Sequence, residues 1–100
     1  MQSDIFIWDE RKNEMNIQKH GVSFEEARFV FNDDNAIYDI DFEHSYDEER
    51  FIIIGMGRIS KLLFVCYCER GDSEIIRIIS ARNADKSEAD LYWENYYEEL

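Results

Sequence analysis

Apolar runs and capping residues in the first third of the chain predict a strand followed by two helices. Residues 5–8 form a short apolar run of the kind found in strands. Asp9 can cap a polar helix that ends at His20, and Gly21 follows in the position where a left-handed residue closes a helix. A Ser-x-x-Glu capping box then predicts a second helix over residues 24–31, because apolar side chains recur there at helical spacing.

The middle of the chain has the patterns of strands. Residues 38–43 alternate between apolar and acidic side chains, which predicts a strand with one solvated face at the edge of a sheet. Three more strands are predicted at residues 50–56, 61–69 and 74–82, and the connections between them are short enough for hairpins. Sequential strands joined in this way form an antiparallel meander.

The last part of the chain predicts a third helix. Asp85 and Glu88 form another capping pair at its start. One stripe of this helix is apolar and mostly aromatic, and it lies opposite an acidic face. The stripe consists of Ala89, Tyr92, Trp93, Tyr96 and Leu100. We expect it to pack against the sheet rather than to serve as a binding platform.

These elements predict an α+β fold, in which two N-terminal helices and one C-terminal helix pack on an antiparallel sheet of four to five strands. The uninterrupted run of strands disfavours a parallel, doubly wound sheet. No proline, internal repeat or low-complexity tract divides the chain, and its 100 residues suit one hydrophobic core. Residues 1–100 are therefore expected to form a single domain.

The composition is that of a globular protein, which we expect to stay in the cytoplasm. Apolar residues make up 45% of the chain and aromatic residues 15%, enough to build a core. The apolar runs are much shorter than the ~20 residues that span a bilayer, and no basic leader is present. Cys66 and Cys68 share one face of a predicted strand, where a mutual disulfide would be strained, so reduced thiols are expected.

The net charge of −12 is unfavourable for an enzyme that acts on nucleic acid, because binding a polyanion depends on Lys and Arg contacts to phosphate. The charge is nevertheless unevenly distributed. Residues 50–82 contain six basic and three acidic side chains and carry +3, whereas the remainder carries −15. A locally basic face could bind phosphate, and the acidic exterior would suit a basic partner protein.

Four segments, in this order, resemble a known family over about residues 6–92. They are WDERKN at 8–13, KHGVSFEEA at 19–27, His44-Ser45 followed by Glu49-Arg50-Phe51, and RIISAR at 77–82. In these segments the chain resembles the BrnT family, which are toxins of type II toxin-antitoxin systems. The KHGVSFEEA and RIISAR segments are specific enough to make a chance match improbable.

The resemblance implies a fold like that of RelE-type ribonucleases and RNA cleavage that halts translation. It also implies neutralisation by a BrnA-type antitoxin that carries a ribbon-helix-helix part, so that DNA is contacted only through the antitoxin. RNA is then the substrate, and neither a cofactor nor a membrane is expected. Metal-independent RNA cleavage needs a base for the 2′-OH proton, cations to stabilise the phosphorane and an acid for the departing 5′ oxygen.

Two histidines are the candidates for proton transfer, because imidazole titrates near neutral pH. His20 lies in the last turn of a predicted helix, where a capping role is as plausible as catalysis. His44 lies in a polar connection just before a strand, a position that more often carries function. We therefore favour His44 over His20.

Two arginines of the last predicted strand, Arg77 and Arg82, are five residues apart and are expected on opposite faces. Only a bulge or bend would let both meet one phosphate. Arg77 stands in an apolar row, and a buried ion pair with an acid such as Glu49 is its structural explanation. Arg82 ends the strand and is freer to bind a phosphate in a bidentate manner.

The other basic candidates lie at strand starts, at turns and in the first helix. Arg50 begins a strand and Arg70 precedes a glycine turn, and either could instead be an exposed surface charge. Lys12 opposes the dipole of the first helix, which favours a functional role. The candidate catalytic residues are His20, His44, Glu49, Arg50, Arg70, Arg77 and Arg82. The candidate RNA-binding residues are Lys12, Arg58 and Lys61.

A metal site is not expected. Asp39, Asp41 and Glu43 share a strand face but lack the loop spacing and glycine of an EF-hand, and a solvated edge explains them. Cys66 and Cys68 lie in an apolar strand, and no paired spacing joins the two histidines, which disfavours zinc.

The rival hypothesis is a non-catalytic module whose acidic surface binds a basic protein or mimics nucleic acid. Arginines gathered around one concavity would support the enzyme, whereas dispersed arginines paired with acids would support the module. The four arginines that decide this are Arg50, Arg70, Arg77 and Arg82.

Overall fold

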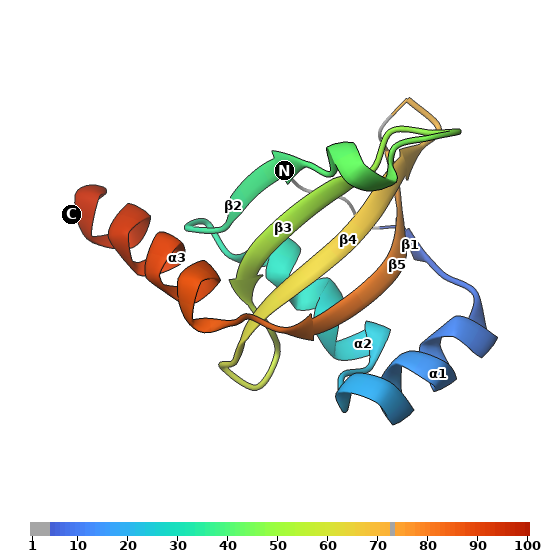
Figure 1. Cartoon of the computed structure of the whole chain (residues 1–100), viewed down its shortest axis with the longest axis horizontal. Coiled ribbons are helices and arrows are strands. Elements are labelled where there is room, and N and C mark those ends of the chain that lie inside the picture. The colour runs from blue at the N-terminus through green and yellow to red at the C-terminus, as the bar shows by residue number, and fades with distance from the viewer. Residues whose placement is uncertain (1–4, 73) are drawn as a thin grey trace.

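The computed structural model describes residues 5–72 and 74–100, and its elements follow the predicted order (Figure 1). In chain order they are β1 (Ile5–Ile7), α1 (Glu10–His20), α2 (Phe24–Ala27), the 3-10 helix η1 (Arg28–Asn32), β2 (Ile37–Ile40), the 3-10 helix η2 (Phe42–His44), β3 (Phe51–Met56), β4 (Leu62–Arg70), β5 (Ile75–Asn83) and α3 (Lys86–Glu98). The fold is α+β, as predicted.

The five strands form one mixed sheet in the order β1-β5-β4-β3-β2. Strands β2 to β5 pair antiparallel, which confirms the predicted meander. β1 instead pairs parallel with β5, so the prediction of an antiparallel sheet is wrong for this strand. The reason is connectivity: the chain leaves β1 through helices and returns at the opposite edge of the sheet, so no hairpin joins β1 to its neighbour.

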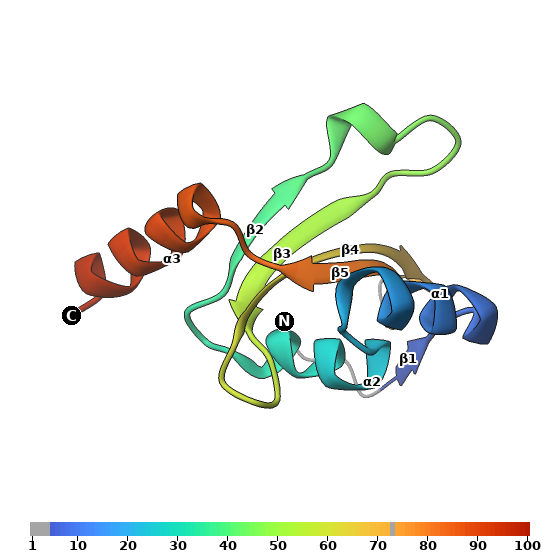
Figure 2. The same cartoon turned by 60° about the horizontal axis from the view of Figure 1, so that its bottom comes forward.

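The helices of the first third cover one face of the sheet. Both views show α1 and α2 on the same side of the strands (Figures 1 and 2). Phe24 of α2 and Val30 of η1 are fully buried there against strand residues that include Ile53, Val65 and Ile76. Burying these apolar side chains is the main stabilising contribution to the fold.

The predicted caps are present and set the helix boundaries. Asp9 accepts hydrogen bonds from two backbone amides of α1, and Gly21 ends that helix with φ of 71°. Ser23 and Asp85 each belong to a complete capping box, at α2 and α3 respectively. The second helix is α-helical only from Phe24 to Ala27, so the α-helix is shorter than the one predicted over residues 24–31. From Arg28 the chain continues as the 3-10 helix η1.

Two buried asparagines fasten α1 to the rest of the molecule. The Asn13 side chain accepts a hydrogen bond from the Phe24 amide at 2.8 Å. The Asn16 side chain donates to the Val22 and Ala81 carbonyl oxygens and accepts from the Ala81 amide, at 2.8, 2.7 and 3.2 Å. β1 pairs with β5 only as far as Arg77. Farther along β5, the Asn16 side chain takes the place of a neighbouring strand by bonding both backbone groups of Ala81.

β2 occupies the edge of the sheet opposite β1, as its alternating pattern predicts, but it ends at Ile40. The segment that follows forms η2 and then folds back onto β3. Ser45 closes this loop, because its hydroxyl donates to the Asp41 carbonyl at 2.6 Å and accepts from the Arg50 amide at 2.9 Å. The loop 41–50 therefore has a defined shape at one end of β3.

α3 leaves the sheet, contrary to the expectation that its aromatic stripe packs there (Figures 1 and 2). Only Tyr92 is buried in this helix, and its hydroxyl donates to Asp33 at 2.7 Å. The neighbouring rings of Trp93, Tyr96 and Tyr97 contact one another instead. Among the described residues no helix is long and apolar enough to cross a membrane.

Candidate active site on the open face of the sheet

A β-bulge in β5 changes which of its side chains share a face. Cys66 of β4 pairs with Ser80, but the next residue of β4, Tyr67, pairs with Ile78. Ile79 is therefore an extra residue in β5, and the alternation of side chains is shifted by one position across it. This bulge had no signal in the hydrophobic pattern of the sequence.

The bulge places Arg77 and Arg82 on the same face of the sheet. Arg77 pairs with Cys68 and Arg82 with Phe64, two residues of β4 whose side chains point the same way. The expectation that the arginines lie on opposite faces is wrong, because the extra residue between them reverses the alternation. No ion pair joins Arg77 to Glu49 within the described part of the chain.

The face that carries these arginines is not covered by α1, α2 or η1, and we name it the open face (Figure 2). Ile53, Val65 and Ala81 point toward the helices, so the residues that alternate with them point the other way. The open-face side chains of β3 to β5 include Ile52, Ile54, Phe64, Cys66, Cys68, Arg77, Ser80 and Arg82.

His44 is held by a buried carboxylate at one end of the open face. Its Nδ1 lies 3.0 and 3.1 Å from the two carboxylate oxygens of Asp41. The Asp41 side chain is only 9% exposed, whereas that of His44 is 59% exposed. Since Nδ1 is engaged, the imidazole presents Nε2 outward, which is the arrangement that orients a histidine for proton transfer.

A small pocket lies beside His44. It has a volume of about 190 Å³ and is lined by His44, Tyr46, Asp47, Glu48 and Arg50. Arg50 is the one cation among these residues, and its charge is close enough to act on the Glu48 carboxyl and on the thiols of Cys66 and Cys68. The guanidinium therefore lies near both the pocket and the open-face thiols.

Glu48 and Arg70 form the other side of this cluster. They are joined by an ion pair and by a second hydrogen bond of 3.4 Å. The hydrogen bond from Arg70, followed by one from the Cys68 thiol, lowers the pKa of the Glu48 carboxyl. Glu49, which the sequence suggested as a catalytic residue and as a partner for Arg77, is instead exposed. It lies at the rim of an adjacent hollow that also includes Arg70.

The two thiols at the centre of the open face are not suited to act as nucleophiles. Burial, followed by the hydrogen bond that it donates to Asp41, raises the pKa of Cys66 to about 12. Burial also raises the pKa of Cys68, which donates to Glu48. Both are free cysteines, and at neutral pH they are neutral hydrogen-bond donors to the carboxylates of the cluster.

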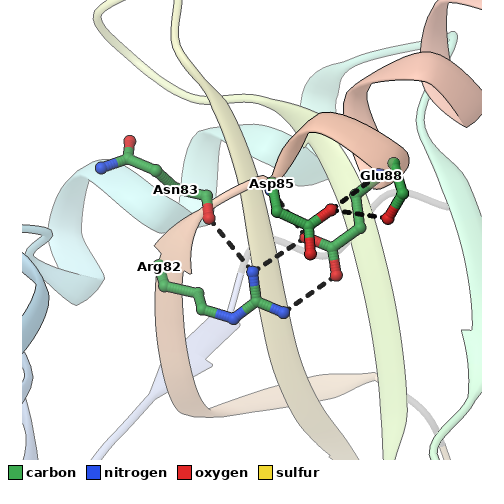
Figure 3. Close-up of polar contacts among 5 residues, drawn as sticks. Arg82, Asn83, Asp85 and Glu88 are labelled. Atoms are coloured by element: carbon green, nitrogen blue, oxygen red, sulfur yellow. Dashed lines mark hydrogen bonds and ion pairs between the residues drawn. The ribbon is translucent and has the colours of Figure 1, made fainter.

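Arg82 is less free than its position at the strand end indicated. Its guanidinium donates to both Glu88 carboxylate oxygens at 2.8 and 2.9 Å, and to the Asn83 carbonyl (Figure 3). It also stacks 4.0 Å above the ring of Phe64. Arg82 therefore ties β5 to the first turn of α3, while its side chain stays 36% exposed on the open face.

His20 does not join His44. It lines a separate groove of about 440 Å³ between α1 and the bulge of β5. Two further cations line the groove, Lys12 and Lys19, and Ile79 and Ser80 of the bulge form its other side. Lys12 and His20 thus lie together in a basic groove beside α1. Neither belongs to the His44 cluster.

Arg58 and Lys61 lie in the turn between β3 and β4, at the opposite end of β3 from the His44 pocket. Both are exposed. Arg58 lies 5.8 Å from the ring centre of Phe29, which belongs to η1 on the helix-covered side. The structure therefore separates these two RNA-binding candidates from the catalytic ones.

The arginines divide into two kinds. Arg70 and Arg82 are paired with glutamates, as expected of an interaction module. Arg50 and Arg77 form no ion pair among residues 5–72 and 74–100, as expected of a phosphate-binding face. In the same described part of the chain, no three His, Cys, Asp or Glu side chains are arranged to hold a metal ion.

Sequence reasoning missed Asp41 and Glu48 as parts of this site. Asp41 was interpreted as part of a solvated strand edge, but the strand ends before it and the side chain turns inward to His44 and Cys66. The sequence signal for the contact between Asp41 and His44 was their spacing of three residues.

Comparisons with known proteins agree on one family. The family model described as the ribonuclease toxin BrnT of type II toxin-antitoxin systems matches residues 8–88. The 1.1 Å crystal structure of the Brucella abortus ribonuclease toxin BrnT is similar, with a TM-score of 0.61 and 28% sequence identity. That similarity covers 82% of this chain and 99% of the Brucella chain. A search of curated proteins gives no match.

Proposed function

Because the chain belongs to the BrnT family of ribonuclease toxins of type II toxin-antitoxin systems, we propose that it cleaves RNA on the open face of its sheet without a metal ion. In this proposal His44 moves the proton and arginines of the open face hold the phosphate. The observation that carries it is the Asp41–His44 pair beside Arg50, at the edge of a face that also presents Arg77.

The chemistry assigned to these residues is transfer of the phosphate from the 5′ oxygen to the neighbouring 2′ oxygen. His44 Nε2 takes the proton of the 2′-OH as that oxygen attacks the phosphorus, and Asp41 stabilises the imidazolium that results. Arg50 and Arg77 stabilise the negative charge on the phosphorane. The Tyr46 hydroxyl in the same pocket supplies a proton to the departing 5′ oxygen.

The wider assignments follow from the family. We propose a RelE-like relationship for the sheet and its helices, and RNA cleavage that inhibits translation in the cytoplasm. The partner is proposed to be a BrnA-type antitoxin whose ribbon-helix-helix part binds DNA, so that this chain meets DNA only through the antitoxin. The acidic exterior supports a basic partner, since the chain carries −12.

Replacing Asp41 by asparagine is expected to lower the cleavage rate on the order of 10²-fold, within the range that a positioned base contributes. Asparagine keeps the shape of the side chain but cannot stabilise an imidazolium. The rate should fall across the whole pH range measured, because the contact that the carboxylate makes with Nδ1 is absent throughout. The measurement is the initial rate of digestion of a labelled RNA from pH 5 to pH 9.

The matched control is Glu43→Gln, which removes one negative charge beside His44 from an exposed residue. It should leave the rate close to that of the wild type across the same pH range. Equal rates for Asp41→Asn and the wild type throughout that range would show that Asp41 does not position His44.

A further inference from the structure

A groove lies between α3 and the open face of the sheet. It has a volume of about 330 Å³, and most of its wall is apolar. Its lining residues are Ile37, Tyr38, Asp39, Ile52, Ile54, Leu91 and Asn95. β2 and β3 form one side and α3 the other, so the groove exists because α3 does not lie flat on the sheet (Figure 2).

The side chains around the groove leave a large apolar surface exposed. Leu91 is 56% exposed and Tyr38 45%. Trp93 and Tyr97, which is 66% exposed, line a second hollow on a different face of α3. Exposed apolar side chains that line a groove are typical of a site where proteins bind one another, and tyrosine and tryptophan are enriched at such sites.

Charge identifies the kind of occupant. Asp39 lies in the groove, and Glu94 and Glu98 line the second hollow on α3. Among the described residues, no lysine, arginine or histidine lines either one. A second copy of this chain would bring the same acids against these, and the whole chain carries −12, so charge disfavours self-association. An occupant with basic residues on either side of an apolar strip would complement the groove.

We propose that this groove is the docking surface for a basic, amphipathic segment of the partner antitoxin. The proposal rests on the proposed function, which supplies the antitoxin. Most of α3 lies beyond Glu88, where the family match ends. The docking surface therefore depends on an element that the family match does not cover.

The position of the groove explains how docking would silence the enzyme. Ile52, which lines the groove, pairs across strands with Cys66, whose thiol donates to the carboxylate of Asp41. The groove is thus one strand away from the residues that hold His44. A segment seated in it lies over the open face, where it excludes RNA from Arg77 and from the His44 pocket.

The test is the affinity of the full-length protein for the purified antitoxin encoded by the adjacent reading frame, measured by biolayer interferometry. Leu91→Lys puts a cation into the apolar groove and should weaken binding at least about 30-fold, the effect of losing a central interface residue. The matched control is Ile17→Lys, because Ile17 is an exposed aliphatic residue, 42% exposed, and belongs to α1, the helix on the far side of the sheet (Figure 2). It should change the affinity by less than about twofold.

The second readout is RNA digestion in the presence of antitoxin. Leu91→Lys should cut RNA at the wild-type rate but resist inhibition, since residue 91 lies outside the His44 pocket. Unchanged affinity and inhibition in Leu91→Lys would overturn the docking surface while leaving the ribonuclease proposal standing. Loss of a dimer in that variant, with antitoxin binding intact, would also overturn it and identify a second copy as the occupant. A wild type that cuts RNA but binds no antitoxin would refute both the docking surface and the proposed partner.

Discussion

Replacing His44 by alanine is expected to lower the rate of RNA cleavage by about 10²- to 10⁴-fold, the usual contribution of a positioned general base. The imidazole is the one group in its pocket that combines an outward nitrogen with a buried carboxylate behind it. Because the His44 side chain is 59% exposed, its removal should cost little stability. The measurement is the initial rate of digestion of a labelled RNA in EDTA, with urea unfolding of both proteins alongside.

The matched control for this variant is His20→Ala. His20 lies in the groove beside α1 and not in the His44 pocket, so its loss should weaken RNA binding at most and leave the cleavage step intact. A His44→Ala protein that cuts at the wild-type rate would remove His44 from the mechanism. If instead His20→Ala abolished cleavage and His44→Ala did not, the active site would lie in the basic groove beside α1.

Replacing Asn16 by alanine is expected to lower the free energy of unfolding by about 2–4 kcal/mol. The side chain is 7% exposed and makes three hydrogen bonds, so its removal leaves the Val22 carbonyl and both backbone groups of Ala81 without their partner. Buried backbone groups that lose a hydrogen bond account for most of that cost. Ala81 lies between Ser80 and Arg82, so the open face should also lose order near the bulge.

Urea unfolding of Asn16→Ala and of Gln18→Ala measures this effect against a control. Gln18 is an exposed residue of the same helix, and its replacement should change stability by less than about 0.5 kcal/mol. If the two variants unfold at the same urea concentration, the pairing between Asn16 and β5 contributes nothing to stability.

The parts of the fold that the sequence predicted are those with local causes. Asp9, Gly21, Ser23 and Asp85 set helix boundaries through hydrogen bonds to residues a few positions away. The meander follows from period-2 patterns and short connections. Each of these signals lies within a window of about ten residues, so no knowledge of the tertiary structure was needed.

The features that the sequence did not reveal depend on contacts between distant residues. The parallel pairing of β1 with β5 joins Ile5 to Ile75, and Asn16 reaches Ala81, 65 positions away. The aromatic stripe of α3 has the spacing of a packing face, but periodicity does not state which surface the rings meet. In this protein Tyr92 bonds to Asp33, whereas Trp93, Tyr96 and Tyr97 contact one another.

The candidate site was predicted in part for the same reason. His44 was favoured because it lies in a loop before a strand, and the structure adds Asp41 as its partner. The relation between Arg77 and Arg82 was predicted wrongly, because a single extra residue in β5 reverses the alternation on which it depended. Glu48, and not Glu49, pairs with an arginine of the cluster, a choice that only the fold of the loop decides.

The most direct test of the central proposal uses two versions of one labelled RNA, unmodified and with a 2′-O-methyl group at every ribose. Each is incubated in EDTA with the purified wild-type protein at low salt, and the product ends are identified by mass spectrometry. We expect cleavage of the unmodified RNA alone, with 2′,3′-cyclic phosphate ends, because the 2′-OH is the attacking group and His44 its base. Intact unmodified RNA, or equal cleavage of the methylated strand, would contradict the proposal that this open face cuts RNA through His44 without a metal.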